Sequence, residues 1–257
     1  LVRSRGLGDV YKRQSGDKVD LHLPKVQEEL IEKVTAVGKP TIVVLMAGSA
    51  IDLNYAQDNC NGILLAWYPG ARGGRAIADL LFGKESPSGK LPITFYKDLE
   101  GMPEFTDYSM KNRTYRYMEK EALYPFGYGL TYSDTCVTEA EVVGEVSAES
   151  DIMLKATVKN NGTVDTDEVV QVYIKDLDSP LAVRNYSLCG FKRVSLKAGE
   201  EKSVEFTISN KAMNIVDEDG NRYIAGKHFR LFAGVSQPDT RSAELTGHKP
   251  AEVEIAL

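Results

Sequence analysis

The sequence predicts an α/β region followed by an all-β domain, and three observations support that prediction. Helix-like and strand-like segments alternate from Pro24 to Phe95, which is typical of a parallel-type sheet with flanking helices. From about Cys136 onward, short strands follow one another between turn signals without helical spacing. The length of 257 residues leaves room for two domains that each bury a core.

The first segment of the α/β region, residues 24–37, predicts an amphipathic helix. Pro24 suits a first helical turn, and Gly38 follows the last one. One apolar stripe runs along this helix and is expected to face the core; it consists of Val26, Leu30, Ile31, Val34 and Val37. The opposite face is charged and is expected to be solvated; it consists of Glu28, Glu29, Glu32 and Lys33.

Two apolar runs without period-two alternation, residues 40–46 and 63–68, predict strands that are covered on both faces. A glycine-rich turn follows the second run, and residues 76–82 carry helical spacing that ends at Gly83. This alternation is too short for a complete doubly wound domain. We therefore expect a partial α/β sandwich, with an incomplete parallel-type sheet whose N-terminal strands are missing.

The C-terminal half predicts a β-sandwich of the immunoglobulin or fibronectin type III kind. Its expected strands span residues 152–159, 168–175, 188–195, 203–209 and 229–235. Residues 97–134 show neither period and are rich in Tyr, Pro and Gly, so they predict a long ordered connection. The expected organisation is a foreign segment at 1–14, the partial α/β sandwich at 15–96, the connection at 97–134 and the β-sandwich at 135–257.

Composition excludes several classes of function. A net charge of −6 and a pI near 5.3 argue against nucleic acid, which requires a basic face. No apolar run approaches the roughly 20 residues of a membrane helix, so no membrane partner is expected. The three cysteines and three histidines lack ligand spacing, and no nucleotide-binding motif is present. No metal and no cofactor are therefore expected.

Residues 1–14 do not fit the pattern of the remainder. They are basic, glycine-broken and aperiodic, and they contain no secretory hydrophobic segment. We interpret them as a segment derived from assembly or cloning, joined to a truncated gene.

Several motifs occur in an order that resembles glycoside hydrolase family 3, the β-glucosidases and β-xylosidases. They are Asp20-Leu21-His22-Leu23-Pro24, Gly38-Lys39-Pro40, Trp67-Tyr68-Pro69-Gly70, Pro87-Ser88-Gly89-Lys90-Leu91-Pro92, Arg113-Thr114-Tyr115-Arg116-Tyr117 and the run from Tyr124 to Tyr132. The resemblance extends from about Gly16 to about Val235. It implies a C-terminal domain of fibronectin type III kind, which agrees with the strand pattern.

The resemblance also implies a retaining mechanism that needs two carboxyl groups. The family's nucleophile is an aspartate on an N-terminal barrel, and its acid/base is a glutamate expected just ahead of Gly16. Residues 1–14 contain no glutamate, and the first one in the chain, Glu28, is predicted on a solvated helix face. No catalytic residue is therefore assigned, and the fragment alone is expected to be inactive.

Four residues are candidates for substrate binding: Asp17, Trp67, Arg113 and Tyr115. Asp17 lies closest to the expected acid/base loop. Trp67 could form a sugar-stacking platform together with Tyr68, although a lone tryptophan after an apolar strand is more often a core residue. Arg113 and Tyr115, with Arg116 and Tyr117 of the same motif, could bind sugar hydroxyls or seal an interface with the barrel, and the pattern favours the interface.

The expected function is that of a C-terminal fragment of a retaining exo-acting β-glycosidase that hydrolyses terminal β-D-xylosyl or β-D-glucosyl residues. The sequences of residues 66–69 and 113–117 resemble the β-xylosidase branch of the family more than the β-glucosidase branch. A non-catalytic module for carbohydrate adhesion or scaffolding remains open. Expected partners are an oligosaccharide substrate in the intact parent, the missing barrel domain and a second copy through self-association. The parent is expected to be periplasmic or secreted.

Overall fold

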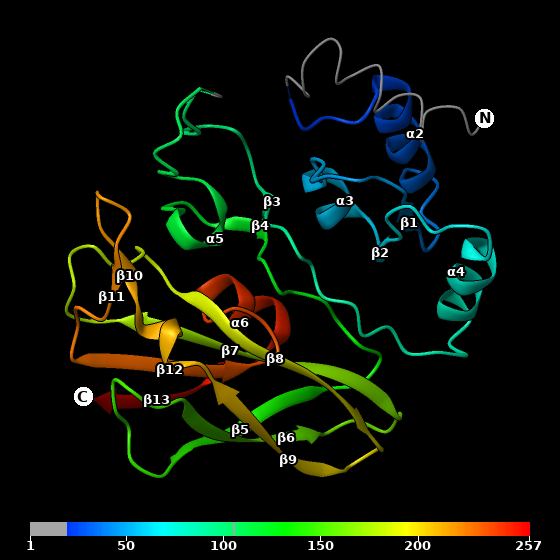
Figure 1. The fold of residues 1–257 in the computed structure, drawn as a ribbon. Helices are drawn as coiled ribbons and strands as arrows, with labels where there is room; N and C mark the ends of the chain where they lie inside the picture. Colours follow the sequence, from blue (N-terminus) through cyan, green and yellow to red (C-terminus); the bar gives the residue numbers. More distant parts are fainter. Residues whose placement is uncertain (1–19, 105) are drawn as a thin grey trace. The chain divides into compact units, whose positions relative to one another are not determined.

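The computed structural model describes residues 20–104 and 106–257 (Figure 1). They form two compact units, one of residues 20–82 with 95–101, the other of residues 83–94 with those from 102 to 257. The first unit contains α2 (Lys25–Thr35), β1 (Ile42–Leu45), α3 (Asn54–Asn59), β2 (Gly62–Leu65), α4 (Gly73–Leu81) and β3 (Phe95–Tyr96).

The second unit contains α5 (Thr114–Tyr117), β4 (Ala122–Tyr124), β5 (Thr135–Val143), β6 (Ile152–Asn160), β7 (Thr166–Asp176), β8 (Ser187–Leu196), β9 (Glu201–Ile208), the 3₁₀ helix η1 (Asn210–Met213), β10 (Ile215–Val216), β11 (Arg222–Tyr223), β12 (His228–Gly234), α6 (Thr240–Thr246) and β13 (Ala251–Ala256).

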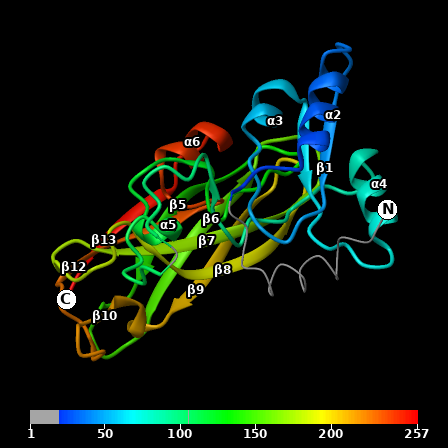
Figure 2. The same ribbon diagram turned by 90° about the horizontal axis from the view of Figure 1, so that it is seen from above.

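The first unit is built around the parallel pair of β1 and β2, in which Ile42 lies opposite Gly62 and Leu45 opposite Leu65. Helices α3 and α4 lie on either side of these strands (Figures 1 and 2). The predicted parallel arrangement is confirmed. The expectation that both strands are covered on both faces is wrong for the described residues, since all of β2 is only half-buried. A two-stranded parallel pair with three helices supplies too few layers to enclose these strands.

Helix α2 also departs from its predicted orientation. The apolar stripe was expected in a core, but Val26 is 77%, Leu30 59% and Val37 67% exposed. No residue of α2 is buried. The helix forms because its residues favour helical geometry, while the apolar stripe finds no cover among the described residues.

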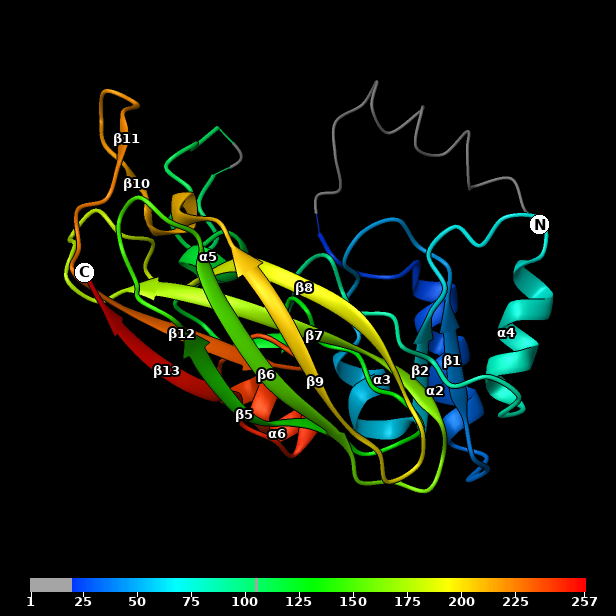
Figure 3. The same cartoon turned by 60° about the horizontal axis from the view of Figure 1, so that its bottom comes forward.

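The second unit is a β-sandwich of two antiparallel sheets, ordered β13-β12-β7-β8 and β5-β6-β9. Figure 3 shows the strands of both sheets. Alternate side chains from the two sheets meet in one core, which includes Val158, Val172, Phe206, Ile208 and Phe229. The predicted sandwich is confirmed, and each of its five predicted strands corresponds to an observed one.

Strand β7 is buried on both faces, although its sequence predicts an alternation of two faces. Val170, Val172 and Ile174 enter the core between the sheets. Gln171 and Tyr173, on the other face, are only 3% and 0% exposed. Gln171 Nε2 donates to the carbonyl of Gly127 at 2.9 Å, so the segment after β4 covers this outer face.

Gly127 allows that cover to lie close to the sheet. Its φ is +78°, and an added Cβ would lie 2.2 Å from Gln171 Oε1 and 2.6 Å from the Tyr173 hydroxyl. Only glycine combines this backbone angle with so close an approach. Residues 102–134 of the predicted connection therefore belong to the sandwich unit, whereas residues 97–101 belong to the first unit.

Residues 83–94 are fixed to the same unit by polar contacts. Lys90 Nζ lies 2.8 Å from Glu168 Oε1 and donates to the carbonyl of Gly129 at 2.6 Å. Ser86 Oγ lies 2.8 Å from Thr166 Oγ1. This segment precedes β3 in the sequence, yet it packs with the strands that follow.

Candidate functional site

The carboxyl ends of β1 and β2 are the place in the first unit where a ligand site is expected. In open parallel sheets, ligands bind beyond the carboxyl ends of the strands, where the following loops meet. The loops 46–53 and 66–72 leave β1 and β2 at this edge, and α3 and α4 begin there. Helix α2 leads into the opposite end of β1, so its first turn reaches the same edge.

The segment before α2 is braced against the loop after β1. The backbone nitrogen of Asp52 donates to the carbonyl of Leu21 at 2.7 Å. His22 Nδ1 lies 3.2 Å from Glu28 Oε1 and 3.7 Å from Asp52 Oδ2. Asp20 braces the same turn, because its Oδ1 accepts from the His22 nitrogen at 3.0 Å.

These contacts place Glu28 and Asp52 beside a histidine, not on either side of an open pocket. Glu28 is therefore less solvated than its helix face predicted, with a side chain 39% exposed. This brace was not predicted from the sequence, since nothing in the spacing of His22 and Asp52 indicates a contact.

Trp67, a predicted substrate-binding residue, lies at this edge in a strained backbone conformation. Its φ is +49°, which is rare for a bulky side chain and costs on the order of 1–3 kcal/mol. The nitrogen of Ala66 donates to the Leu45 carbonyl at 2.8 Å, continuing the pairing of the strands up to this turn. The side chain of Trp67 is half-buried.

The next residue, Tyr68, is 50% exposed. The end of its ring lies against the loop after β1, where a Cβ added to Gly48 would be 2.5 Å from the Tyr68 hydroxyl. The two loops therefore meet at this edge through an aromatic ring and a glycine. A glycine in the loop shortly after an apolar strand, here Gly48, is the sequence signal that indicates such a close approach.

Arg113, predicted to bind substrate, anchors a loop of the second unit. Its Nη2 donates to the carbonyls of Glu104 at 2.7 Å and Pro103 at 3.3 Å. Its Nε is buried and has no hydrogen-bond partner among the described residues. The guanidinium is thus partly engaged by the chain itself.

Tyr115, also predicted to bind substrate, lies in an aromatic cluster. Its ring stacks on Phe126 with centroids 4.3 Å apart, and it packs 6.1 Å from the rings of Tyr173 and Tyr186. Its hydroxyl accepts from the backbone nitrogen of Leu188 at 3.0 Å. Burial raises the pKa of the Tyr115 phenol. Ring packing and this hydrogen bond explain the position of the Tyr115 side chain without a substrate.

Arg116 belongs to the same aromatic and basic motif as Arg113 and Tyr115, for which the sequence predicts a role in sugar binding or in an interface with the barrel. Its Nε is buried without a partner among the residues that the structure describes, and its guanidinium lies 5.6 Å from the ring centroid of Tyr117. The backbone around it is strained, with φ of +64° at Met110, +56° at Asn112 and +56° at Thr114. Strained backbone near a functional site is common.

Asp17, the remaining predicted residue, lies outside the described residues. Within residues 20–104 and 106–257, no group of three or more His, Cys, Asp or Glu side chains is arranged to hold a metal ion. In the same part of the chain, no helix has the length and apolar character needed to span a membrane.

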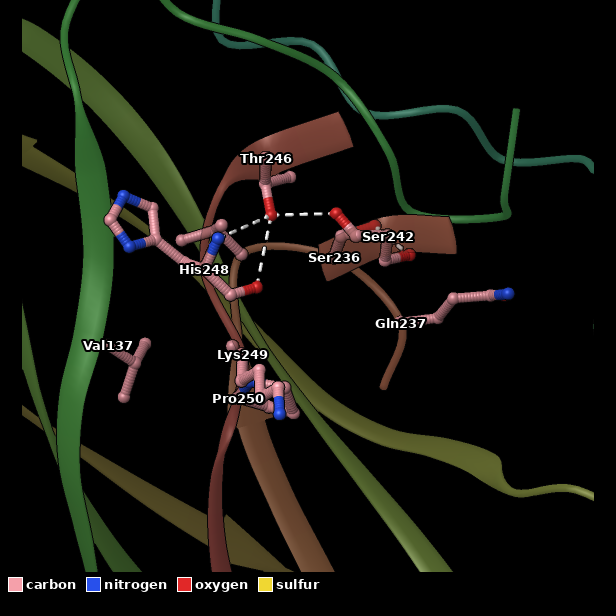
Figure 4. Close-up of a pocket in the computed structure, with 10 residues that line it drawn as sticks. Val137, Ser236, Gln237, Ser242, Thr246, His248, Lys249 and Pro250 are labelled. Atoms are coloured by element: carbon pink, nitrogen blue, oxygen red, sulfur yellow. Dashed lines mark hydrogen bonds between the residues drawn. The ribbon is translucent and has the colours of Figure 1, made fainter. Parts of the chain in front are cut away.

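A small hollow in the sandwich unit lies between α6 and the end of β12 (Figure 4). Thr246 Oγ1 donates to the Ser242 carbonyl at 2.7 Å. The hydroxyls of Ser236 and Ser242 form a hydrogen bond of 3.0 Å. Gln237 Oε1 is buried without a partner in the described structure. No carboxyl group lines the hollow, so it offers no pair for glycoside chemistry.

Two family matches cover most of the chain. Residues 5–132 match the glycosyl hydrolase family 3 C-terminal domain, and residues 168–237 match the fibronectin type III-like domain. The chain belongs to glycosyl hydrolase family 3. The first match includes residues 5–14, whose assignment to a foreign segment stays a prediction.

The family 3 relatives include both xylosidases and glucosidases. The chain is 40% identical over 236 residues to a xylan 1,4-beta-xylosidase of Xylanibacter ruminicola, covering 91% of this chain and 27% of that protein. It is 31% identical over 235 residues to a periplasmic beta-glucosidase of Salmonella typhimurium, covering 86% and 31% respectively. A solved β-glucosidase structure from Erythrobacter marinus matches with a TM-score of 0.79 and 32% identity, covering 94% of this chain and 31% of that one.

The family 3 chain is thus short relative to the proteins it resembles. It spans 27–33% of the length of the first curated relatives.

Proposed function

We infer that this chain supplies the C-terminal portion of a retaining, exo-acting β-glycosidase that removes terminal β-D-xylosyl or β-D-glucosyl residues from oligosaccharides. The observation that carries this inference is the 40% identity to a xylan 1,4-beta-xylosidase across 91% of the chain. The lower identity of 31% to a periplasmic β-glucosidase favours xylosides as the substrate class.

The proposed reaction is a double displacement in which one carboxylate attacks the anomeric carbon and a second carboxyl group protonates the leaving oxygen. In this proposal the nucleophile belongs to an N-terminal barrel and the acid/base to the loop ahead of Gly16. Residues 20–257 then contribute the carboxyl edge of β1 and β2, with Trp67 near the sugar, and Asp17 is proposed to line the sugar site from the segment before them. Arg113 and Tyr115 stabilise loops of the second unit. They contact substrate only through the atoms that their hydrogen bonds and ring contacts within the chain leave exposed.

A chimera tests this function directly. The matching C-terminal part of the Xylanibacter ruminicola enzyme is replaced by residues 15–257, and hydrolysis of aryl β-xyloside and aryl β-glucoside is measured. We expect turnover with the xyloside preferred, whereas residues 1–257 alone give no turnover above background because no pair of catalytic carboxyl groups is assigned to them. A folded chimera without activity, or turnover by the chain alone that Asp17→Asn abolishes, would contradict the proposal.

The partner proposed for the chain is the barrel of the complete enzyme, and self-association is proposed where that partner is absent. The exposed stripe of α2 supports this, since Val26, Leu30 and Val37 are each more than half exposed and contiguous apolar surface promotes association. Light scattering across a concentration series is the test. Leu30→Lys should lower the apparent mass toward the monomer, while Lys33→Gln on the polar face should not.

A further inference from the structure

The end of the Tyr68 ring packs directly against the backbone of Gly48, a contact that we call the seat of the ring. A Cβ at position 48 would lie 2.5 Å from the Tyr68 hydroxyl oxygen and 2.6 Å from its Cε2. Those distances are too short for any real side chain, so the end of the ring rests on bare backbone. At the same time, half of the Tyr68 surface is open to solvent.

The turn before Tyr68 fixes the direction of the ring. Trp67 adopts a left-handed φ of +49°, and the Ala66 nitrogen is held by the Leu45 carbonyl at 2.8 Å. The chain therefore changes direction immediately after its last sheet hydrogen bond, and it presents Tyr68 toward the loop after β1. A ring positioned by backbone loses little conformational entropy when a ligand covers it.

Polar groups are available along the same edge. The side chain of Asp52, in the loop after β1, is 28% exposed, and that of His22, in the segment braced against this loop, is 62% exposed. Aromatic surface with a few polar groups nearby is the usual lining of a small-molecule site. A core role accounts less well for a ring that is half open to solvent.

We propose that Tyr68, seated on Gly48, is a stacking surface for a pyranose ring of a β-linked oligosaccharide. The proposal rests on the function inferred above and adds a residue that takes part in sugar binding. β-Linked xylose and glucose both present C–H groups on their ring faces, and these groups complement the face of an aromatic ring. The two sugars differ only in the substituent at C5. The surface therefore supports affinity for both sugars and does not select between them.

The complete chain carries its own probe, because Trp67 is its single tryptophan and is adjacent to Tyr68. Tryptophan fluorescence is titrated with xylotriose and, separately, with cellotriose, and calorimetry repeats each titration without relying on fluorescence. Tyr68→Ala should raise Kd about fivefold for both sugars, while Tyr68→Phe keeps the ring and stays within about twofold. Mannitol, which has the hydroxyls without a ring, should give no saturable signal.

Gly48→Ala provides the matched test of the seat, because it leaves Tyr68 in place but displaces its ring. We expect weaker binding of both sugars with an unchanged circular dichroism spectrum. Gly74→Ala is the control, since an added Cβ there meets nothing within 4 Å. Should Tyr68→Ala bind as tightly as the unmodified chain, or should the unmodified chain bind neither sugar, the stacking surface is refuted. If the stacking surface is refuted but the chimera hydrolyses the aryl glycosides, the inferred enzyme function still holds. If the chain binds the sugars through Tyr68 but the folded chimera is inactive, the stacking surface holds and the enzyme function fails.

Discussion

Lys90 Nζ lies 2.8 Å from Glu168 Oε1, and the two side chains are only 8% and 2% exposed. The second carboxylate oxygen of Glu168 accepts from Thr135 Oγ1 at 2.6 Å, and its first also accepts from the Val169 nitrogen at 2.6 Å. Buried charges are tolerated when they are paired and hydrogen-bonded in this way. The pair connects a segment that precedes β3 to the first and third strands of the sandwich, β5 and β7.

Lys90→Met should destabilise the second unit strongly, because it leaves the Glu168 carboxylate buried without its counter-charge. The expected cost is about 3–5 kcal/mol, which corresponds to a fall in Tm of roughly 10 °C. Lys155→Met is the matched control, because the Lys155–Glu141 pair is exposed at 42% and 65% and should cost less than about 1 kcal/mol. Equal melting shifts for the two variants would contradict the importance of the buried pair. The double change Lys90→Met with Glu168→Leu should recover much of the loss.

Excising residues 135–257 should give a less stable domain than residues 83–257. The shorter piece exposes the outer face of β7, where Gln171 and Tyr173 are buried in the complete unit, and it lacks Lys90. Thermal melts of the two fragments are the measurement. Similar melting temperatures would show that the preceding segments do not support the sandwich.

Limited proteolysis tests where the domains divide. The change of sequence period predicts a boundary between about Thr131 and Cys136. In the structure, Ser133 Oγ donates to Asn160 Oδ1 at 2.6 Å, and the Asn161 nitrogen donates to the Asp134 carbonyl at 2.7 Å. We therefore expect early cleavage within residues 106–111, which are exposed, and resistance at 131–136. Early fragments beginning near residue 134 would instead support the boundary read from the sequence.

Two substitutions at Tyr115 separate a packing role from a substrate role. Tyr115→Phe preserves the stack on Phe126 and removes the acceptor of the Leu188 nitrogen, which should cost about 1 kcal/mol of stability. Tyr115→Ala also removes the ring and should cost about 3–5 kcal/mol. Melting temperatures measure both effects, and titration with xylotriose shows whether Tyr115→Phe weakens sugar binding. A loss of binding without a loss of stability would favour the substrate role.

Acid should weaken the second unit partly through Asp167. The hydroxyl of Ser195, and then the guanidinium of Arg193, lower the pKa of this carboxyl below its usual range. Because the folded pKa lies below the unfolded value of about 3.9, the stabilisation is present above that value and is lost as the pH falls through the folded pKa. Asp167→Asn should therefore lower Tm at pH 7, and the difference should shrink toward pH 3. Glu139→Gln, an exposed carboxyl on β5, is the control and should show no such convergence.

The sequence predicts the class of each unit because local pattern determines it. The apolar runs became β1 and β2, and the strands from 152 onward became β6, β7, β8, β9 and β12. It does not reveal β5, where a register shift between Val137 and Glu139 interrupts the alternation. The predicted strands also omit β13 at the sheet edge, although its residues Ala251-Glu252-Val253-Glu254-Ile255 alternate with period two.

The candidate site was harder to predict, because contacts between distant residues decide it. The chemistry of Trp67 makes it a candidate, but its strained φ and the contact of the Tyr68 ring with Gly48 depend on two loops that are separate in sequence. Tyr115 and Arg113 were selected for their side chains, yet hydrogen bonds to Leu188 and Glu104 occupy the groups that made them candidates. Single-sequence patterns carry no information about such long-range partners.

The path of the chain between the two units has a further consequence. The polypeptide leaves the first unit after Phe82, returns at Phe95 and leaves again after Gly101, so three peptide segments join the units instead of one. A recombination event that moved only the gene block for residues 102–257 would carry β7 without Lys90. One that moved only the block up to residue 82 would carry the helices without residues 95–101. This sandwich is therefore not an interchangeable appendage, and we expect the two units to have been inherited together as one genetic block.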